Sequence, residues 1–332
     1  MLNNLKTVFW LLGFLLLVFA VQSVDIKSVT ILLTKMKWGL LIVLSIYILI
    51  NFADAAAWKY ALKPDEAKTI TLGQMWRIRQ IGEAFNMATP LGTMGGEPLK
   101  AELLKEVYRL NMKQTVSSLV VSRTTNLLGL ISFFLIGAVF IWRAPGIDST
   151  FKTTSFIGLT VFSILILLFL FFQIHGGLKI ISNWFAKFPL GKPIRHALKE
   201  LETLSHHMAN YYNENPIRCL ESIWYAFVGW VLGVAELYLT LYFLGENLSL
   251  TDVWIIEALI QLIKVGSFFI PLNLGALESG MVIIFASMGM STNLGMAASV
   301  VRRIKELVWI ALGLGMSTSM VSKSFKGKPR RK

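Results

Sequence analysis

Long apolar runs restrict this chain more than any other feature of its sequence. Residues 155–174, for example, contain no charged side chain. A helix needs about 20 apolar residues to cross roughly 30 Å of hydrocarbon, and uninterrupted runs of this length are typical of helices rather than of barrel strands. The sequence therefore predicts an all-α, polytopic membrane bundle with about six full spans. The predicted spans are residues 7–24, 36–60, 115–141, 155–174, 217–244 and 295–320.

The composition also indicates a membrane protein. Hydrophobic side chains make up 55% of the 332 residues, charged ones only 15%, and the mean hydropathy is +0.62, which is too apolar for an ordinary soluble domain. Cys219 is the single cysteine, so no disulfide framework is expected. The histidines at 175, 196, 206 and 207 have no carboxylate or cysteine at ligand spacing. We expect no metal, no cofactor and no catalytic constellation, and hence no enzyme.

Two distant segments share one pattern. The first is ATPLGTMGGEPLK at residues 88–100, and the second is FFIPLNLGALESG at residues 268–280. In each, a Glu lies seven residues after a Pro, with Gly between them. The pairs are Pro90 with Glu97 and Pro271 with Glu278. Because Pro and Gly interrupt helices, each segment predicts two half-helices joined by a break, which is a re-entrant hairpin.

The repeated pattern suggests a duplicated unit. The break residues are Pro90, Gly95, Gly96, Pro271 and Gly275, and an arginine follows each break in the next span, Arg123 and Arg303. We predict a single membrane domain over residues 1–332 with two repeats, an amphipathic linker and a basic tail. Their bounds are 36–141 for repeat one with hairpin 68–110, 175–216 for the linker, 217–320 for repeat two with hairpin 253–290, and 322–332 for the tail.

The charge distribution predicts the orientation. The net charge is +13, and basic residues gather in the linker and the tail, which places both on the cytoplasmic side next to anionic lipid headgroups. Nucleic acid is not an expected partner. The loop with Glu246 and Asp252 has no Lys or Arg and should lie outside, although Lys27, Lys35 and Lys37 would then be external too. Both termini are expected in the cytoplasm, and the hairpins should enter from opposite sides of an inner membrane, as in many secondary transporters.

Four charged residues are the candidate substrate-binding groups. Glu97 and Glu278 are expected at the hairpin tips, where each contacts a cationic headgroup, a proton or an arginine. Alternatively, each caps its half-helix or forms a structural salt bridge. Arg123 and Arg303 present guanidinium groups suited to a lipid phosphate, or they only neutralise the glutamates. Intramembrane charges are functional by default.

Three neighbouring features carry smaller expectations. Lys100 and Glu102, close to Glu97, suggest a wet interface, and Arg302 is expected to face lipid headgroups. The Gly95-Gly96 pair brings backbone N–H groups toward a phosphate, or it serves only the helix break.

These motifs resemble those of a known family. GEAFNMATPLGTMGGEPLKAELL, followed by VVSRTTNLL and later by VVRRIKELVW, is similar to the lysylphosphatidylglycerol synthase transmembrane family, also described as flippase-like. The resemblance covers nearly the whole chain. The matching positions are Gly82, Asn86, Pro90, Gly95, Gly96, Arg123, Pro271, Gly275, Glu278 and Arg303. The bifunctional synthases also carry a soluble aminoacyltransferase domain, which we expect this protein to lack.

The resemblance implies a role with polar-headed lipids. The leading hypothesis is a flippase-like protein that binds or translocates a phosphate-headed lipid, either a phospholipid or an isoprenoid-linked lipid. One alternative is a membrane transferase that modifies a lipid headgroup. The other is a membrane partner subunit of a lipid-modifying enzyme.

Overall fold

The computed structural model is all-helical in the part of the chain that it describes, which is residues 11, 14–88, 95–145, 147–174, 208, 210–268 and 270–326. The all-α prediction is therefore confirmed for these residues. The helices are Phe14–Gln22, α2 (Ile26–Lys35), α3 (Gly39–Ala61), α4 (Pro64–Lys68), α5 (Leu72–Ala88), α6 (Glu97–Tyr108), α7 (Met112–Arg143), α8 (Ser149–Ile174), α11 (Pro216–Leu244), α12 (Leu250–Gly266), the 3₁₀ turn η1 (Pro271–Asn273), α13 (Ala276–Ser287) and α14 (Thr292–Lys326).

Four of these helices are long and apolar enough to cross a membrane, namely α3, α7, the segment Ser149–Phe171 of α8, and α11. They coincide with the predicted spans 36–60, 115–141, 155–174 and 217–244. A bent helix pair near the N-terminus raises the total to at most five, so the predicted count of six is not confirmed. Helix α14 has 35 residues, but charged side chains between residues 302 and 306 interrupt its apolar sequence.

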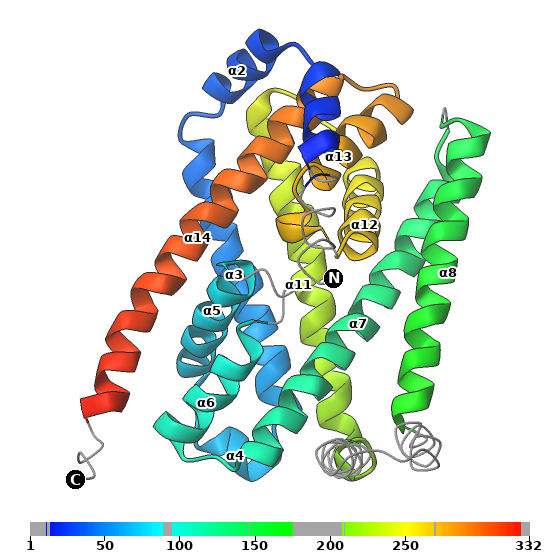
Figure 1. Ribbon diagram of the computed structural model, residues 1–332. Coiled ribbons are helices and arrows are strands. Elements are labelled where there is room, and N and C mark those ends of the chain that lie inside the picture. Colours follow the sequence, from blue (N-terminus) through cyan, green and yellow to red (C-terminus); the bar gives the residue numbers. More distant parts are fainter. Residues whose placement is uncertain are drawn as a thin grey trace.

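The region of the predicted first span differs from a single straight crossing. Helix Phe14–Gln22 and α2 meet at 86°, and the loop expected after residue 24 is helical. The side chain of Asp25 accepts hydrogen bonds from the backbone N–H groups of Lys27 and Ser28, at 3.1 Å each, which favours a helix start at this point. The chain therefore turns sharply and continues as α2, at the upper end of Figure 1.

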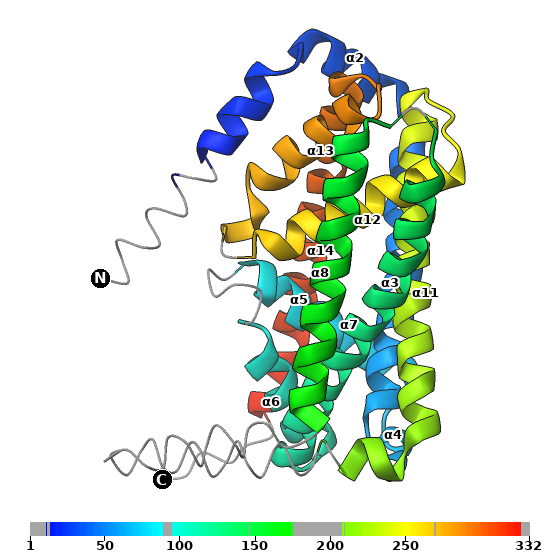
Figure 2. The same ribbon diagram turned by 90° about the vertical axis from the view of Figure 1, so that its right-hand side faces the viewer.

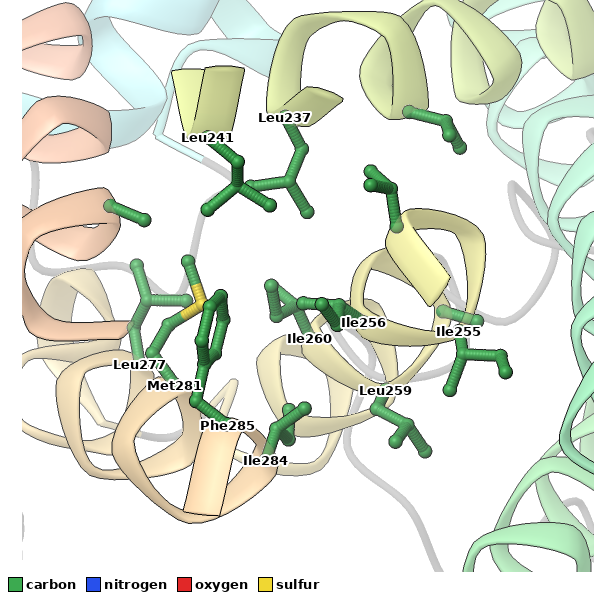
Figure 3. Packing of buried hydrophobic residues seen from close by; sticks show 14 of the residues in the cluster. Leu237, Leu241, Ile255, Ile256, Leu259, Ile260, Leu277, Met281, Ile284 and Phe285 are labelled. Carbon is green, nitrogen blue, oxygen red and sulfur yellow. The ribbon is translucent and has the colours of Figure 1, made fainter. Parts of the chain in front are cut away.

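The core of the bundle is apolar and close-packed. Helices α3 and α11 lie against each other, and α7 packs on both. In the other half, side chains from α11, α12 and α13 interdigitate, with Leu237, Ile260 and Phe285 each no more than 2% exposed (Figure 3). Within a membrane, such contacts stabilise the bundle through van der Waals packing rather than through removal of apolar surface from water.

Two short hairpins occupy opposite halves of the bundle. Helices α5 and α6 lie in the half near α4, whereas α12 and α13 lie in the half near α2 (Figures 1 and 2). Helix α14 contacts both, since it packs against α5 and α13.

Helix α5 begins at Leu72, four residues later than the predicted hairpin. The reason is that the side chains of Thr71 and Gln74 each accept a hydrogen bond from the other residue's backbone N–H. Pro90, most of the linker 175–216 and tail residues 327–332 lie outside the described residues.

Candidate functional site

A polar pocket lies between hairpin α5–α6 and the spans α3 and α7. Its empty volume, including the open mouth, is about 380 Å³. It is lined by Asp54, Ala57, Trp58, Arg79, Glu83, Glu97, Lys100, Leu119, Ser122, Arg123 and Asn126. Three of these are carboxylates and three are cations, so the pocket is close to neutral while it concentrates charge inside an otherwise apolar bundle.

Glu97 lies at the centre of the pocket's charges. It is the first residue of α6, where the unpaired N–H groups of a helix start favour a negative charge. Its Oε1 accepts hydrogen bonds from Lys100 Nζ at 2.9 Å, Arg123 Nη2 at 2.5 Å and Asn86 Nδ2 at 3.1 Å. Glu97 thus links α5, α6 and α7 through one carboxylate oxygen.

Lys100 is buried, which corrects the expectation of a wet interface at this residue, whereas the side chain of Glu102 is 50% exposed. Only 4% of the Lys100 side chain is exposed, because its hydrocarbon stem packs along Gly82 and its ammonium lies 5.8 Å from the ring centroid of Trp58. The Nζ atom also donates to Glu83 Oε1 at 2.6 Å. Two carboxylates and an aromatic face therefore compensate the charge that burial would otherwise disfavour.

Close backbone packing explains the glycines of hairpin one. A Cβ atom at Gly96 would lie 1.9 Å from the carbonyl oxygen of Gly82, so only glycine fits where α6 begins against α5. Asn86 fixes the same junction, since its Oδ1 accepts a 2.7 Å hydrogen bond from Gly96 N. These three positions hold Glu97 at the pocket.

Asp54 and Arg79 form a second ion pair in the pocket, at 2.6 Å. Arg79 on α5 also donates to the side chain of Asn51, one turn before Asp54 on α3. Neither residue was a predicted site residue, nor was Glu83. The signal was present, because Asp54 is an acid inside an apolar run, and such residues are rarely lipid-facing.

Arg123 is the most accessible charge of the pocket. It lies on α7, in a span, yet 51% of its side chain is exposed, compared with 16% for Glu97. Its Nη2 lies 2.5 Å from Glu97 and 3.6 Å from Glu83. A guanidinium carries five N–H donors in a fork that suits paired anionic oxygens. Among the described residues, only Nη2 of Arg123 has a carboxylate partner, so the guanidinium has further donors to offer to a ligand in the pocket.

The second hairpin holds its charges differently. Arg303 donates from Nε and Nη2 to the two oxygens of Glu278, at 2.7 and 3.3 Å, and from Nη1 to Glu306 at 2.8 Å. It also donates to the carbonyl oxygens of Leu272 and Asn273. All of its donor positions are engaged, so Arg303 closes the break between α12 and α13.

The backbone of this break is unusual and explains the motif. Leu272 and Asn273 both have positive φ, at 58° and 50°, a region that costs about 1–2 kcal/mol per residue without glycine. Gly275 has φ 76° and its N–H donates to Glu278 Oε2 at 2.8 Å. Glu278 is thus both a helix cap and a salt-bridge partner, two roles that the sequence left as alternatives.

Three further charged pairs lie beside hairpin two. Arg302, expected at the lipid headgroups, is instead 8% exposed and bonds Glu257 of α12 at 2.6 Å, because α14 turns this face toward the bundle. Lys305 pairs with Glu236 of α11, and Lys264 lies 3.9 Å from Glu306. Glu236 and Glu257 were not predicted site residues, although both are acids in apolar helices.

The predicted site residues therefore form two clusters, one per hairpin. Glu97 pairs with Arg123, and Glu278 pairs with Arg303. Within the described ranges, no three His, Cys, Asp or Glu side chains are placed to hold a metal ion.

Apolar spans, short internal hairpins and ion pairs enclosed among helices define a multi-pass helical membrane protein. The chain belongs to the family described as the lysylphosphatidylglycerol synthase TM region, whose model matches residues 7–315. This confirms the family that the motifs indicated. The chain is also similar to a UPF0104 membrane protein of Methanothermobacter thermautotrophicus, 26% identical over 258 residues, which cover 71% of this chain and 72% of that protein. No solved structure matches the chain.

Proposed function

We propose that this protein binds a phosphate-headed lipid in the pocket beside hairpin one and moves it between the leaflets of the cell membrane. One observation carries the proposal: Arg123 is half-exposed inside a charged pocket of a membrane bundle. The family description, which names the membrane region of a lipid-modifying protein, supports a lipid as the ligand. Both a phospholipid and an isoprenoid-linked lipid have the required phosphate.

The pocket provides a route for the headgroup. A phosphate that approaches Arg123 replaces Glu97 as its partner, because guanidinium groups bind phosphate and carboxylate oxygens in the same fork geometry. Glu97 retains Lys100 and Asn86, so it is not left as an isolated buried charge. The acyl chains stay beside the exposed apolar side chains of the spans, such as Leu135 and Val139 on α7.

The two hairpins, which lie in opposite halves of the bundle, suggest a mechanism of alternating access. We interpret the chain as an inverted repeat of six spans with two opposed hairpins, in which Glu278 and Arg303 form the second half-site. In this structure Arg123 is accessible while Arg303 has every donor position engaged. This asymmetry fits a state that is open at hairpin one and closed at hairpin two, as expected for transporters built from such repeats.

The membrane context completes the proposal. Both termini lie in the cytoplasm, the basic tail contacts anionic lipid headgroups, and the protein changes no covalent bond of its lipid. The linker 175–216 is the docking segment for a lipid-modifying enzyme that supplies or consumes this lipid.

Removal of the Arg123 guanidinium tests the proposal. In vesicles that contain the purified protein and a fluorescent phospholipid, Arg123→Ala should slow leaflet transfer about 10- to 100-fold, since a hydrogen bond to a charged group contributes about 1.5–3 kcal/mol. Arg77→Ala is the matched control, because Arg77 is an exposed arginine of α5 that does not line the pocket. Unchanged transfer in Arg123→Ala would remove this pocket from the mechanism, and a chemically altered lipid would favour a transferase instead.

A further inference from the structure

The ion pair between Glu236 and Lys305 lies outside the pocket and has no assigned role. Glu236 is on α11 and Lys305 on α14, and their side chains are 7% and 9% exposed. Lys305 Nζ donates to Glu236 Oε1. The other carboxylate oxygen, Oε2, is buried and has no hydrogen-bond partner among the described residues.

This pair is less satisfied than its neighbours. Glu257 uses both oxygens on Arg302 and Gln261, and Glu278 uses both on Arg303 and Gly275. Lys305, by contrast, has one carboxylate oxygen and the face of Tyr47, whose ring centroid lies 4.6 Å from Nζ. A buried carboxylate oxygen without a hydrogen-bond partner is costly, and a proton can add to Oε2 without displacing an existing hydrogen bond. The added proton leaves the buried Lys305 ammonium without its counter-charge, which favours a rearrangement of the two helices.

The charged groups around Glu236 determine how an added proton changes the local electrostatic balance. Lys305 faces Glu236 from α14, and the ring of Tyr47 on α3 lies close to that ammonium. Arg302 of α14 is within electrostatic reach of Glu236, and Glu257 of α12 approaches α11 at Gly233, one turn away. The described ion pairs beside hairpin two comprise four carboxylates and four cations, namely Glu236, Glu257, Glu278 and Glu306 with Lys264, Arg302, Arg303 and Lys305. One added proton therefore leaves a net positive charge on this set.

Helix α14 links this pair to both hairpins. Arg303 of α14 closes hairpin two. Toward the other hairpin, the carbonyl oxygen of Trp309 accepts a 3.1 Å hydrogen bond from Gln80 of α5, and the Trp309 ring lies 5.3 Å from that of Tyr47. A change in the attraction between α11 and α14 therefore acts on the helix that both hairpins contact.

We propose that Glu236 is a proton-binding site that drives the movement of lipid, an inference that rests on the proposed function. A proton from the aqueous phase adds to Oε2, the carboxylate loses its negative charge, and the attraction between Glu236 and Lys305 that holds α14 to α11 is lost. Helix α14 is then free to shift and to open hairpin two. The added positive charge matches the single negative charge of a phosphodiester headgroup, so one proton accompanies one lipid.

Lipid transfer under a pH gradient tests the coupling. In vesicles that contain the full chain and a fluorescent phosphodiester lipid, the lipid should accumulate in one leaflet by up to about tenfold per pH unit, as one-to-one linkage requires. Glu236→Gln should keep transfer but lose this dependence on the gradient. Glu246→Gln, a change in an exposed loop acid, should behave as the unaltered protein. Accumulation driven by a sodium gradient rather than by pH would overturn the proposal.

Infrared difference spectra test proton binding without transport. Acidification should produce a carboxylic acid C=O band that Glu236→Gln lacks and Glu246→Gln retains. If lipid is transferred but the carboxylic acid band is absent and transfer does not depend on pH, the proton site is wrong and the proposed function stands. If the band appears but no lipid is transferred, the proposed function is wrong and the proton site stands. If Glu236→Gln does not fold, the neutral pair Glu236→Gln with Lys305→Gln replaces it, and a persisting band would contradict the assignment.

Discussion

Single atoms decide the geometry of hairpin one. At Gly96 there is room for a hydrogen atom only, since a Cβ would lie 1.9 Å from the carbonyl oxygen of Gly82. Backbone, unlike the end of a flexible side chain, cannot move aside without separating α5 from α6. The same junction holds Glu97 against Arg123, so a steric change in the backbone is also a change in the pocket.

Gly96→Ala should therefore destabilise the protein by about 1–3 kcal/mol or more, as overpacking of a tight contact does. Thermal unfolding in detergent measures the effect. Gly73→Ala on α5 is the matched control, because a Cβ there meets nothing within 4 Å and the change from glycine inside a helix is stabilising by about 0.5–1 kcal/mol. Equal melting temperatures for the two variants would show that α5 and α6 do not approach as described.

At the level of the helix, the sequence indicated the helix breaks better than the partners of the charges. Pro and Gly act on their own segment, so the start of α6 at Glu97 and the break at Pro271 could be expected from local chemistry. Asp54 and Arg79, in contrast, are 25 residues apart in sequence. Their pairing depends on how α5 packs against α3, and no local pattern encodes that packing.

The same limit applies to α14. Its helical period could be predicted, but not which side faces the bundle, so Arg302 was placed at the lipid headgroups when it is buried against Glu257. Helix rotation depends on the neighbours, here mainly α5, α13, α2 and α11. The candidate residues Glu278 and Arg303 were identified because the motif repeats, whereas Glu236 occurs in no repeated motif.

The stability of hairpin two, α12 with α13, should depend on Arg303. Arg303→Ala leaves Glu278, which is 5% exposed, without its cation, and frees the carbonyl groups of Leu272 and Asn273. Loss of one partner of a buried pair costs about 3–5 kcal/mol. In the double variant Glu278→Gln with Arg303→Ala, position 278 has no charge left to compensate, and Glu306 keeps Lys264 at 3.9 Å. The loss of stability should therefore be smaller than the sum of the single losses. Additive effects in a thermal unfolding cycle would contradict the coupling.

The whole molecule has two distinct ends. The end with α4 carries hairpin one, and the end with α2 carries hairpin two and the turn after α11 (Figure 1). Lys35 lies beside Gly245 in that turn, so lysines of α2 share an end with the acidic loop. Charge counting over short loops therefore gives a mixed signal at this end, and the orientation is best decided by direct labelling.

Cysteine labelling in a Cys219→Ser background tests both the two ends and their orientation. Lys68, at the end of α4, and Glu246, just after α11, are both exposed. Because the basic linker and tail are expected in the cytoplasm, a membrane-impermeant maleimide added to intact cells should label Glu246→Cys. Lys68→Cys should react only after the membrane is permeabilised. The reverse result would invert the proposed orientation and keep the architecture. Reaction of both positions from the same face would place the two hairpins on one side and would contradict alternating access between them.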